Sequence, residues 1–255
     1  DSTRALTVVG ASDGTGSSIL VCYNSSLASK FSVRDDGYTV VGGSMAVIGN
    51  IAVSDAAGPV IQNEAATATN PTLVPNNADP DTGIGWASAN ALSLITAGAE
   101  RMRIDANGNI VAPVQSSFYA TCAAKANVTG HGTTVTLGSA AGFSWTEVQD
   151  RNADFATGNF TAPVAGFYHM SGTTQWSGLN SATSGIAYLS VSNGNIQILH
   201  NPTSIANVST NYNVNISQVV YMDAGDNAYL AMYINGAGSD VCDLDSAQFS
   251  GYLLG

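Results

Sequence analysis

The stretch from Asp154 to Met170 reads Asp-Phe-Ala-Thr-Gly-Asn-Phe-Thr-Ala-Pro-Val-Ala-Gly-Phe-Tyr-His-Met, and the C-terminal half of the chain is interpreted outward from it. Phe160 stands between two polar residues, an alternation typical of a short strand with one buried face. Pro163 has no amide hydrogen for a neighbouring strand, so the strand must end there. Gly166 supplies the dihedral freedom of a tight corner, and Phe167 begins a second strand. The stretch therefore predicts two β-strands joined by a corner.

The spacing of small and aromatic residues here resembles the signature of the complement C1q-like globular head, a relative of tumour necrosis factor. The residues that carry the resemblance are Thr157, Gly158, Phe160, Ala162, Pro163, Gly166 and Tyr168. The closing run Phe249–Leu254 is similar to the last strand of that family. Met170 and Gly172 depart from it, since the family usually carries aromatics there, and the expected upstream aromatic is displaced to Phe155. The resemblance implies a trimeric C1q/TNF-like jelly-roll β-sandwich over residues 116–255.

The composition excludes several classes of protein. Charged residues make up only 10% of the chain, against roughly a quarter in globular proteins, and neutral polar residues are plentiful. A net charge of -11 with two lysines, Lys30 and Lys125, argues against nucleic acid or an anionic membrane as partner. No apolar run approaches the ~18 residues of a membrane span, and the N-terminus is not leader-like. Because the chain does not begin with Met, we expect it to be a piece of something longer.

The first 115 residues contain short β-like pieces and one repeated unit of alternating residues. Phe31–Val40 and Met102–Val111 align with each other, each with an Asp-Gly or Asn-Gly turn in its middle. Such turns match the twist of paired strands, so each unit is predicted to be a β-hairpin. An isolated hairpin cannot bury a face. We therefore expect copies of the same chain to cover these hairpins in an intertwined, trimeric, β-rich shaft over residues 1–115.

Residues 70–86 carry three prolines and two glycines, which forbid regular structure across most of the segment. Together with the following run to Val111, they resemble the segment that many tailed-bacteriophage fibres carry just before their terminal domain. The resemblance implies a phage tail fibre, located in the virion and assembled in the host cytoplasm. It also implies that other tail or baseplate proteins bind the missing N-terminal part. The Ser-Lys self-cleaving chaperone of many fibres is absent, because no lysine follows Lys125.

Alternation and aromatic content predict the strands of the head and the ends at which they are connected. Strands are predicted at 118–124, 159–162, 167–176, 185–191, 196–199, 212–222, 228–234 and 249–254, with a side hairpin at 133–138. If successive strands alternate in direction, the minimal turns at 165–166, 193–194 and 223–226 lie at the shaft end. The longer connections at 125–157, 177–184, 200–211 and 235–247 then lie at the free end. Short turns at one end and long loops at the other predict one recognition face.

The candidate receptor-binding residues lie in or beside these long connections. They are Trp176, Asn180, His200, Asn201, Asn207, Asp240 and Asp243. Exposed aromatics and amides stack on sugar faces and bond hydroxyls, although a tryptophan at the end of a strand is as often part of the core. Asp240, Asp243 and Asp245 form an acidic cluster that calcium could bind, but a solvated, turn-forming acidic loop is the better interpretation. No other metal or cofactor is predicted.

Catalysis is not predicted. The three histidines are far apart, no nucleophile elbow or phosphate loop is present, and the chain has only three glutamates. Asp79 and Asp81 stand beside turn residues, where an aspartate side chain usually forms hydrogen bonds with the backbone of the turn. Of the three cysteines, Cys122 and Cys242 are expected to lie near each other, because the first and last strands of the head should be antiparallel neighbours. Both are expected to be thiols, because phage proteins assemble in a reducing cytosol.

These observations predict a non-enzymatic receptor-binding protein that attaches a virion to a host polysaccharide or lipopolysaccharide through the distal loops of a trimeric head. Two alternatives remain open. The first is a polysaccharide depolymerase tailspike, which the scarcity of paired acidic residues disfavours. The second is a non-viral C1q-like adhesin or spore-surface protein, for which collagen-like repeats ahead of the head would be expected and are missing.

Overall fold

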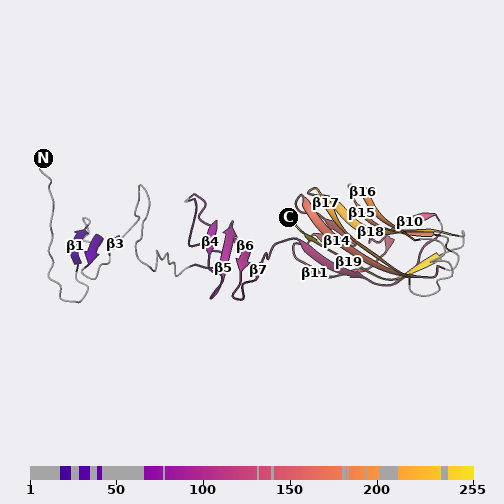
Figure 1. Ribbon diagram of the computed structural model, residues 1–255, viewed down its shortest axis with the longest axis horizontal. Coiled ribbons are helices and arrows are strands. Elements are labelled where there is room, and N and C mark those ends of the chain that lie inside the picture. The colour runs from indigo at the N-terminus through magenta and orange to yellow at the C-terminus, as the bar shows by residue number, and fades with distance from the viewer. Residues whose placement is uncertain are drawn as a thin grey trace. The chain divides into compact units, whose positions relative to one another are not determined.

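The computed structural model contains only β-strands as regular elements in the part that it describes (Figure 1). The described residues are 18–23, 29–34, 39–41, 66–76, 78–130, 132–138, 141–179, 182, 184–192, 194–200, 212–236 and 241–255. The chain forms two compact units, residues 1–61 and 62–255, which are described separately below. The expected boundary at residue 115 falls inside the second unit. Within the described residues, no helix has the length and hydropathy to cross a membrane.

The first unit contains a small antiparallel sheet in the order β1-β2-β3. Its strands are β1 (Ser18–Tyr23), β2 (Ser29–Arg34) and β3 (Thr39–Val41). Phe31 of β2 lies opposite Val41 of β3, which confirms the first predicted hairpin. The expectation that this hairpin has no partner within the chain is wrong, since β1 pairs with the other edge of β2.

The second unit begins with a four-stranded antiparallel sheet in the order β4-β5-β6-β7. Its strands are β4 (Gly83–Gly85), β5 (Leu92–Thr96), β6 (Ala99–Ile104) and β7 (Ile110–Val111). Arg103 of β6 lies opposite Val111 of β7, which confirms the second predicted hairpin. This hairpin also has a partner in the chain, because β5 pairs with β6 along its whole length.

Residues 116–255 form a sandwich of two antiparallel sheets, which we name sheet I and sheet II. Sheet I has the order β11-β8-β19-β14-β17, with β9 paired to β19. Its strands are β8 (Ser117–Cys122), β9 (Lys125–Gly130), β11 (Trp145–Asp150), β14 (Gly166–Ser177), β17 (Tyr212–Met222) and β19 (Val241–Leu253). The predicted closing strand is therefore the central strand of this sheet.

Sheet II has the order β12-β13-β18-β15-β16, with β10 paired to β18. Its strands are β10 (Thr133–Thr136), β12 (Phe155–Ala156), β13 (Asn159–Thr161), β15 (Ser184–Val191), β16 (Gly194–His200) and β18 (Asn227–Asn235). From β13 onward the chain crosses between the two sheets at each step except the β15–β16 hairpin, which stays in sheet II, as in a jelly roll. The all-β fold class and the jelly-roll β-sandwich are thus confirmed.

The stretch that predicted the fold lies at the centre of the core. Phe160 and Tyr168 are completely buried on either side of the corner, and the Tyr168 hydroxyl donates a hydrogen bond to the Val164 carbonyl. The Phe118 ring from sheet I stacks on Phe160 with ring centroids 4.8 Å apart. Phe155, the displaced aromatic, also stacks on the Phe118 ring, with ring centroids 4.9 Å apart. Aromatic pairs of this kind add stability beyond the apolar area that they bury.

Two predicted loops contain strands. The connection at 125–157 holds β9, β10, β11 and β12, and most of the connection at 235–247 is the first half of β19. The inward residues of β19 change phase between Leu244 and Ala247, where the pairing with β14 shifts its register. A strand with such an irregularity breaks the period of two, so the sequence pattern hid its first half.

The predicted proximity of Cys122 and Cys242 is wrong. Cys122 lies opposite Ala247, whereas Cys242 lies opposite Thr129. The two positions are about five residues apart along β19, roughly 16 Å at the usual strand rise. Both side chains are buried and no disulfide joins them, as expected. The Cys22 side chain lies outside the described residues.

Candidate functional site

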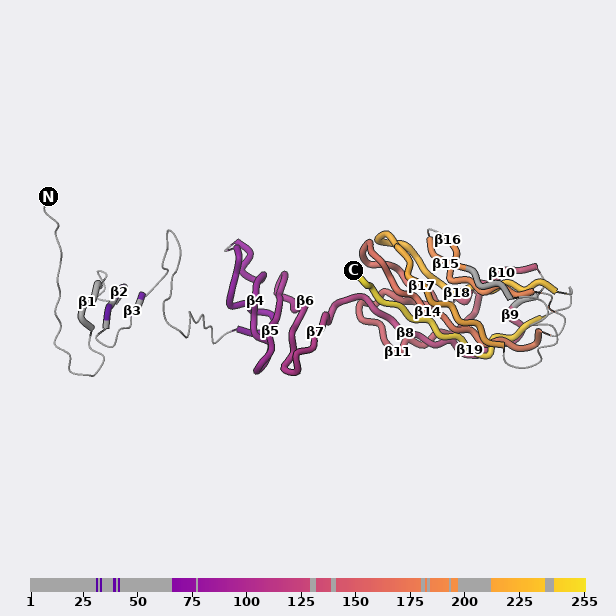
Figure 2. The backbone as a smooth tube through the Cα atoms, in the orientation of Figure 1, coloured from indigo at the N-terminus to yellow at the C-terminus, as the bar shows by residue number. Residues whose placement is uncertain are grey.

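The two ends of the sandwich can be told apart from its hydrogen bonds and from the directions of its strands. Figure 2 traces the course of the chain by colour. The amide of Leu253, at the end of β19, donates to the carbonyl of Ser116, just before β8 begins. We name this the proximal end. The distal end is where β14, β16 and β18 end and where β15, β17 and β19 begin, because all neighbouring strands are antiparallel. The predicted strand directions are therefore confirmed.

The proximal end carries short turns. In the turn between β17 and β18, Asp226 donates its amide to the Asp223 carbonyl and accepts the Asp223 amide at Oδ2, 2.8 Å away. Gly225 between them has a φ of 90°, which favours glycine. A turn whose polar groups are satisfied internally in this way holds the sheet together and leaves few groups for a partner.

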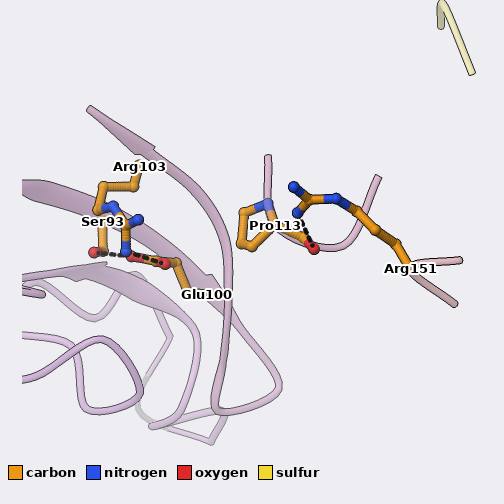
Figure 3. Close-up of polar contacts among 5 residues, drawn as sticks. All are labelled: Ser93, Glu100, Arg103, Pro113 and Arg151. Atoms are coloured by element: carbon orange, nitrogen blue, oxygen red, sulfur yellow. Dashed lines mark hydrogen bonds and ion pairs between the residues drawn. The ribbon is translucent and has the colours of Figure 1, made fainter. Parts of the chain in front are cut away.

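One segment predicted at the free end lies at the proximal end. β11 runs back along β8, so the residues that follow it return to the start of the sandwich. The Arg151 guanidinium donates to the Pro113 carbonyl at 3.0 Å (Figure 3), and the Asn152 amide donates to the Val114 carbonyl at 3.1 Å. The prediction that all of 125–157 lies at the distal end is therefore wrong for residues 151–154. These contacts tie the sandwich to the strand-free residues before β8.

Trp176 is not an exposed sugar-stacking residue. It is the penultimate residue of β14, and its side chain is only 2% exposed. It lines a cavity of about 10 Å³ between the sheets, together with Tyr212 and Ile234, which is room for about one water molecule. Trp176 is therefore a core residue, and its assignment to the recognition face is wrong.

Asp243 and Asp245 lie in β19 and not in a loop. Asp243 accepts the backbone amide of Asn127 at 2.7 Å, and Asp245 accepts the Ser177 hydroxyl at 2.8 Å. Both carboxylates therefore accept hydrogen bonds from other residues of the sandwich. Among the described residues, no group of three acidic, histidine or cysteine side chains could hold a metal ion. The less favoured calcium alternative also involves Asp240, which lies outside the described residues, so it stays untested.

The remaining predicted residues lie in or beside the connections that follow β14, β16 and β18 in the sequence. Asn180, Asn201, Asn207 and Asp240 lie outside the described residues. His200 is the last residue of β16, and its side chain is likewise outside the description. Their assignment to receptor binding stays a prediction.

The outer face of sheet I carries a patch of half-exposed aromatic and apolar residues. Phe167 lies opposite Tyr221 with ring centroids 5.4 Å apart, and the His169 ring lies 5.2 Å from Tyr252. Val219 lies opposite His169 and joins the two pairs. A hydrogen bond with Asp223 and the negative charge of its carboxylate raise the pKa of the Tyr221 phenol above its ordinary value. We name Phe167, His169, Val219, Tyr221 and Tyr252 the sheet I patch.

The outer face of sheet II has a different character. Its outward residues in β10, β15 and β18, together with Asn195 of β16, are mainly tyrosines, hydroxyl residues and amides. They line a shallow groove of about 180 Å³, formed by Thr134, Thr136, Tyr188, Ser190, Asn195, Tyr229 and Ala231. The prediction from sequence missed both outer faces. The signal was present in the alternation, since Tyr188, Tyr229 and Tyr252 stand at outward positions of their strands.

Comparison with known proteins gives similarities of fold. No protein-family model matches the chain, and no curated protein matches it. Among solved structures, the globular domain of zebrafish complement 1qA protein is 17% identical with a TM-score of 0.40, over 55% of this chain and 98% of that one. Eiger TNF from S. frugiperda is 13% identical with a TM-score of 0.37, over 55% and 94%. The PRD1 vertex protein P5 is 10% identical with a TM-score of 0.37, over 56% and 99%.

The strand orders of sheets I and II, and not these similarities, establish the jelly roll. The comparisons therefore leave the function to be inferred from the surfaces of the molecule.

Proposed function

We propose that the chain is a non-enzymatic receptor-binding protein of a bacteriophage tail fibre, which assembles as a homotrimer and attaches the virion to a host surface glycan. The observation that carries the proposal is the difference between the two ends of the sandwich. Short turns occupy the proximal end, one of them closed by its own hydrogen bonds, whereas the connection after β16 at the distal end spans eleven residues, 201–211. Longer connections on a rigid scaffold are where recognition residues are most often found.

The polarity of the β4–β7 sheet supports assembly with other copies. Leu92 and Leu94 in β5 are 48% and 42% exposed, while Ser93 between them is completely buried. The Ser93 hydroxyl donates to Glu100 at 2.6 Å, and Arg103 donates to the same carboxylate at 2.9 Å (Figure 3). The covered face of β5 holds the buried Ile95 as well as Ser93, yet the opposite face leaves two leucines in water, which is unusual for a soluble sheet. Identical chains that bury these leucines would remove the conflict.

The exposed apolar face of this sheet extends over neighbouring strands. Ile104 lies opposite Leu92 in the sheet, and Ile110 lies opposite Ile104; both are exposed. The sheet I patch adds a second such face in the sandwich. Soluble oligomers are most often closed and symmetric, and the C1q-like resemblance favours threefold symmetry. Three copies would repeat every distal connection, and avidity would strengthen a weak single-site affinity.

The setting rests on the resemblance of residues 70–111 to the segment that precedes the terminal domain of tail fibres. It implies a place in the virion, assembly in the host cytoplasm and contacts with other tail proteins. The ligand class rests on composition, because neutral polar residues with few charges suit carbohydrate hydroxyls. The absence of enzyme activity is proposed from the scarcity of glutamates and of paired carboxylates in the sequence.

An array of bacterial capsular and lipopolysaccharides tests the proposal directly. The wild-type protein should be retained on a subset of neutral glycans. Alanine substitution of Asn180, Asn201 or Asn207 should weaken retention and leave thermal unfolding unchanged. The matched control is Asp223→Ala in the proximal turn, which should leave retention as it is.

Two outcomes would contradict the proposal. If Asp223→Ala abolishes retention and the asparagine variants do not, the recognition end is wrong. If the retained polysaccharide is shortened after incubation with the protein, the chain is a depolymerase and the non-enzymatic function is wrong.

A further inference from the structure

The groove on the outer face of sheet II has a floor made by one small residue. Along β18 the outward residues are Tyr229, Ala231 and Tyr233, and Ala231 lies opposite both Tyr188 of β15 and Thr136 of β10. Ala231 is only 4% exposed, because its larger neighbours surround it. A hollow of about 180 Å³ remains above this residue.

Two tyrosines form the walls of the groove. Ser190, two residues after Tyr188 in β15, lies opposite Tyr229, so the two tyrosines are diagonal neighbours on one face. Such neighbours are about 7–8 Å apart, which leaves space between their rings. Both side chains are partly exposed, and among the described residues the structure gives their hydroxyls no hydrogen-bond partner. The walls therefore offer flat apolar rings with polar tips that remain available.

The ends of the groove are neutral and polar. At one end, the Ser190 hydroxyl donates to Oδ1 of Asn195 at 2.6 Å, which fixes this amide with its nitrogen as the remaining donor. At the other end, β10 places the exposed hydroxyls of Thr134 and Thr136. No ionisable carboxylate, amine or guanidinium is among the residues that line the groove.

We propose that this groove is a binding subsite for a neutral sugar, separate from the distal connections. A pyranose ring has an apolar face of axial C–H bonds and an edge of hydroxyls. The Tyr188 or Tyr229 ring would pack on that face, while Asn195 and the two threonines would bond the hydroxyls. An anionic sugar is disfavoured, because the groove lacks a cation and the chain carries a net charge of -11.

The position of the groove is compatible with the proposed assembly, on which this inference rests. The sheet I patch is apolar and lies on the opposite face of the sandwich, so burial of that patch between copies would leave sheet II in solvent. One groove per chain would then be repeated around the side of the trimer. A long surface polysaccharide could contact a distal connection and a groove at once, which raises the effective concentration at the second site.

The test uses the full chain, labelled with fluorotyrosine, and short neutral oligosaccharides of glucose, galactose, mannose or N-acetylglucosamine. NMR resonances of Tyr188 and Tyr229, assigned by single Phe substitutions, should shift saturably with at least one oligosaccharide. Ala231→Leu fills the hollow and keeps both tyrosines, so it should weaken binding at this site by about tenfold or more, near 1.4 kcal/mol. Tyr233→Ala is the matched control, because it changes the same face of β18 outside the groove and should leave the shifts unchanged.

Failure of this inference differs from failure of the proposed function. If oligosaccharides bind but the two tyrosine resonances do not move, and Ala231→Leu binds like wild type, the groove is not a sugar site while glycan attachment stands. If neither oligosaccharides nor the polysaccharide array retain the protein, both proposals fall. Thermal unfolding of each variant, measured in parallel, must match wild type for its binding result to count.

Discussion

Gly172 in β14 and Leu230 in β18 face each other across the core, so closely that a Cβ atom on Gly172 would overlap with Leu230 Cδ2. Gly251 in β19 has the same relation to Met170, whose Sδ occupies the place of a Cβ at position 251. The glycines in sheet I thus make room for larger side chains from the opposite sheet and a neighbouring strand. This explains the departures at Met170 and Gly172 from the aromatic pattern of C1q-like heads.

Gly172→Ala should destabilise the sandwich by about 1–3 kcal/mol, because a close-packed core has no space for the added methyl group. Denaturant unfolding measures the change. Gly138→Ala is the control, since a Cβ there would meet its nearest neighbour at an ordinary 3.6 Å. In a double-mutant cycle, Gly172→Ala should cost less stability in a Leu230→Ala background than in the wild-type protein. Additive effects of the two changes would contradict the packing argument.

The hairpin between β6 and β7 should weaken in acid. The Asn109 amide donates to the Asp105 carboxylate at 3.1 Å, and the backbone amides of Asn107 and Asn109 donate at 2.9 Å. These bonds, the Asn109 side chain first, lower the pKa of Asp105 below its ordinary value. A lowered folded pKa means that the contribution is complete above the unfolded pKa of about 3.9 and is lost as pH falls through the folded value.

An NMR titration of the Asp105 carboxyl tests this. The midpoint should lie below that of an unstructured aspartate, and Asn109→Ala should move it upward. A midpoint at or above the ordinary value in the wild-type protein would show that the turn does not hold the carboxylate as described.

Cys122 should be chemically inert in the folded protein. Burial raises the pKa of its thiol to about 11, so very little thiolate is present at neutral pH. Labelling with a thiol reagent, followed by mass spectrometry of the peptides, should find Cys122 unmodified until the chain is unfolded. Rapid labelling of Cys122 under native conditions, or a peptide disulfide-linked to Cys242, would contradict the described burial and strand register.

Leu94→Ser should weaken assembly and leave the sandwich intact. The side chain is exposed in a single chain, so its loss costs little there, but each copy would lose apolar area buried between chains, at about 25 cal/mol per Å². Analytical ultracentrifugation should show dissociation at a higher protein concentration than for wild type. Val164→Ser, at a similarly exposed valine in the corner before β14, is the control. Equal dissociation of both variants would mean that Leu94 lies outside any interface.

The sequence predicted the strands of the sandwich well because most of them have one buried face. The alternation in β14 and β17 placed these strands nearly at their observed bounds, and both early hairpins were located from their Asp-Gly and Asn-Gly turns. β19 was predicted too short because its pairing with β14 shifts register where the period breaks. The pairing of β1 and β5 with the two hairpins, and of β4 with β5, was not predicted. The alternation of residues and the turn type do not specify which other strand lies alongside a hairpin.

The candidate site was less predictable. The sequence left open whether Trp176 is exposed or part of the core, because the end of a strand does not reveal whether the next element covers it. The groove depends on the adjacency of β10, β18, β15 and β16, which are distant in sequence, so no single stretch contains its pattern. Tyr188 and Tyr229 are recognisable as outward residues, but only the register brings them together.

The account depends most on three copies covering the apolar face of the β4–β7 sheet and the sheet I patch. Light scattering of the wild-type chain, coupled to size exclusion and carried to low concentration, measures this directly. The account predicts a single species of three times the 26.0 kDa chain mass. A stable, folded monomer would contradict it, because both apolar faces would then remain in water.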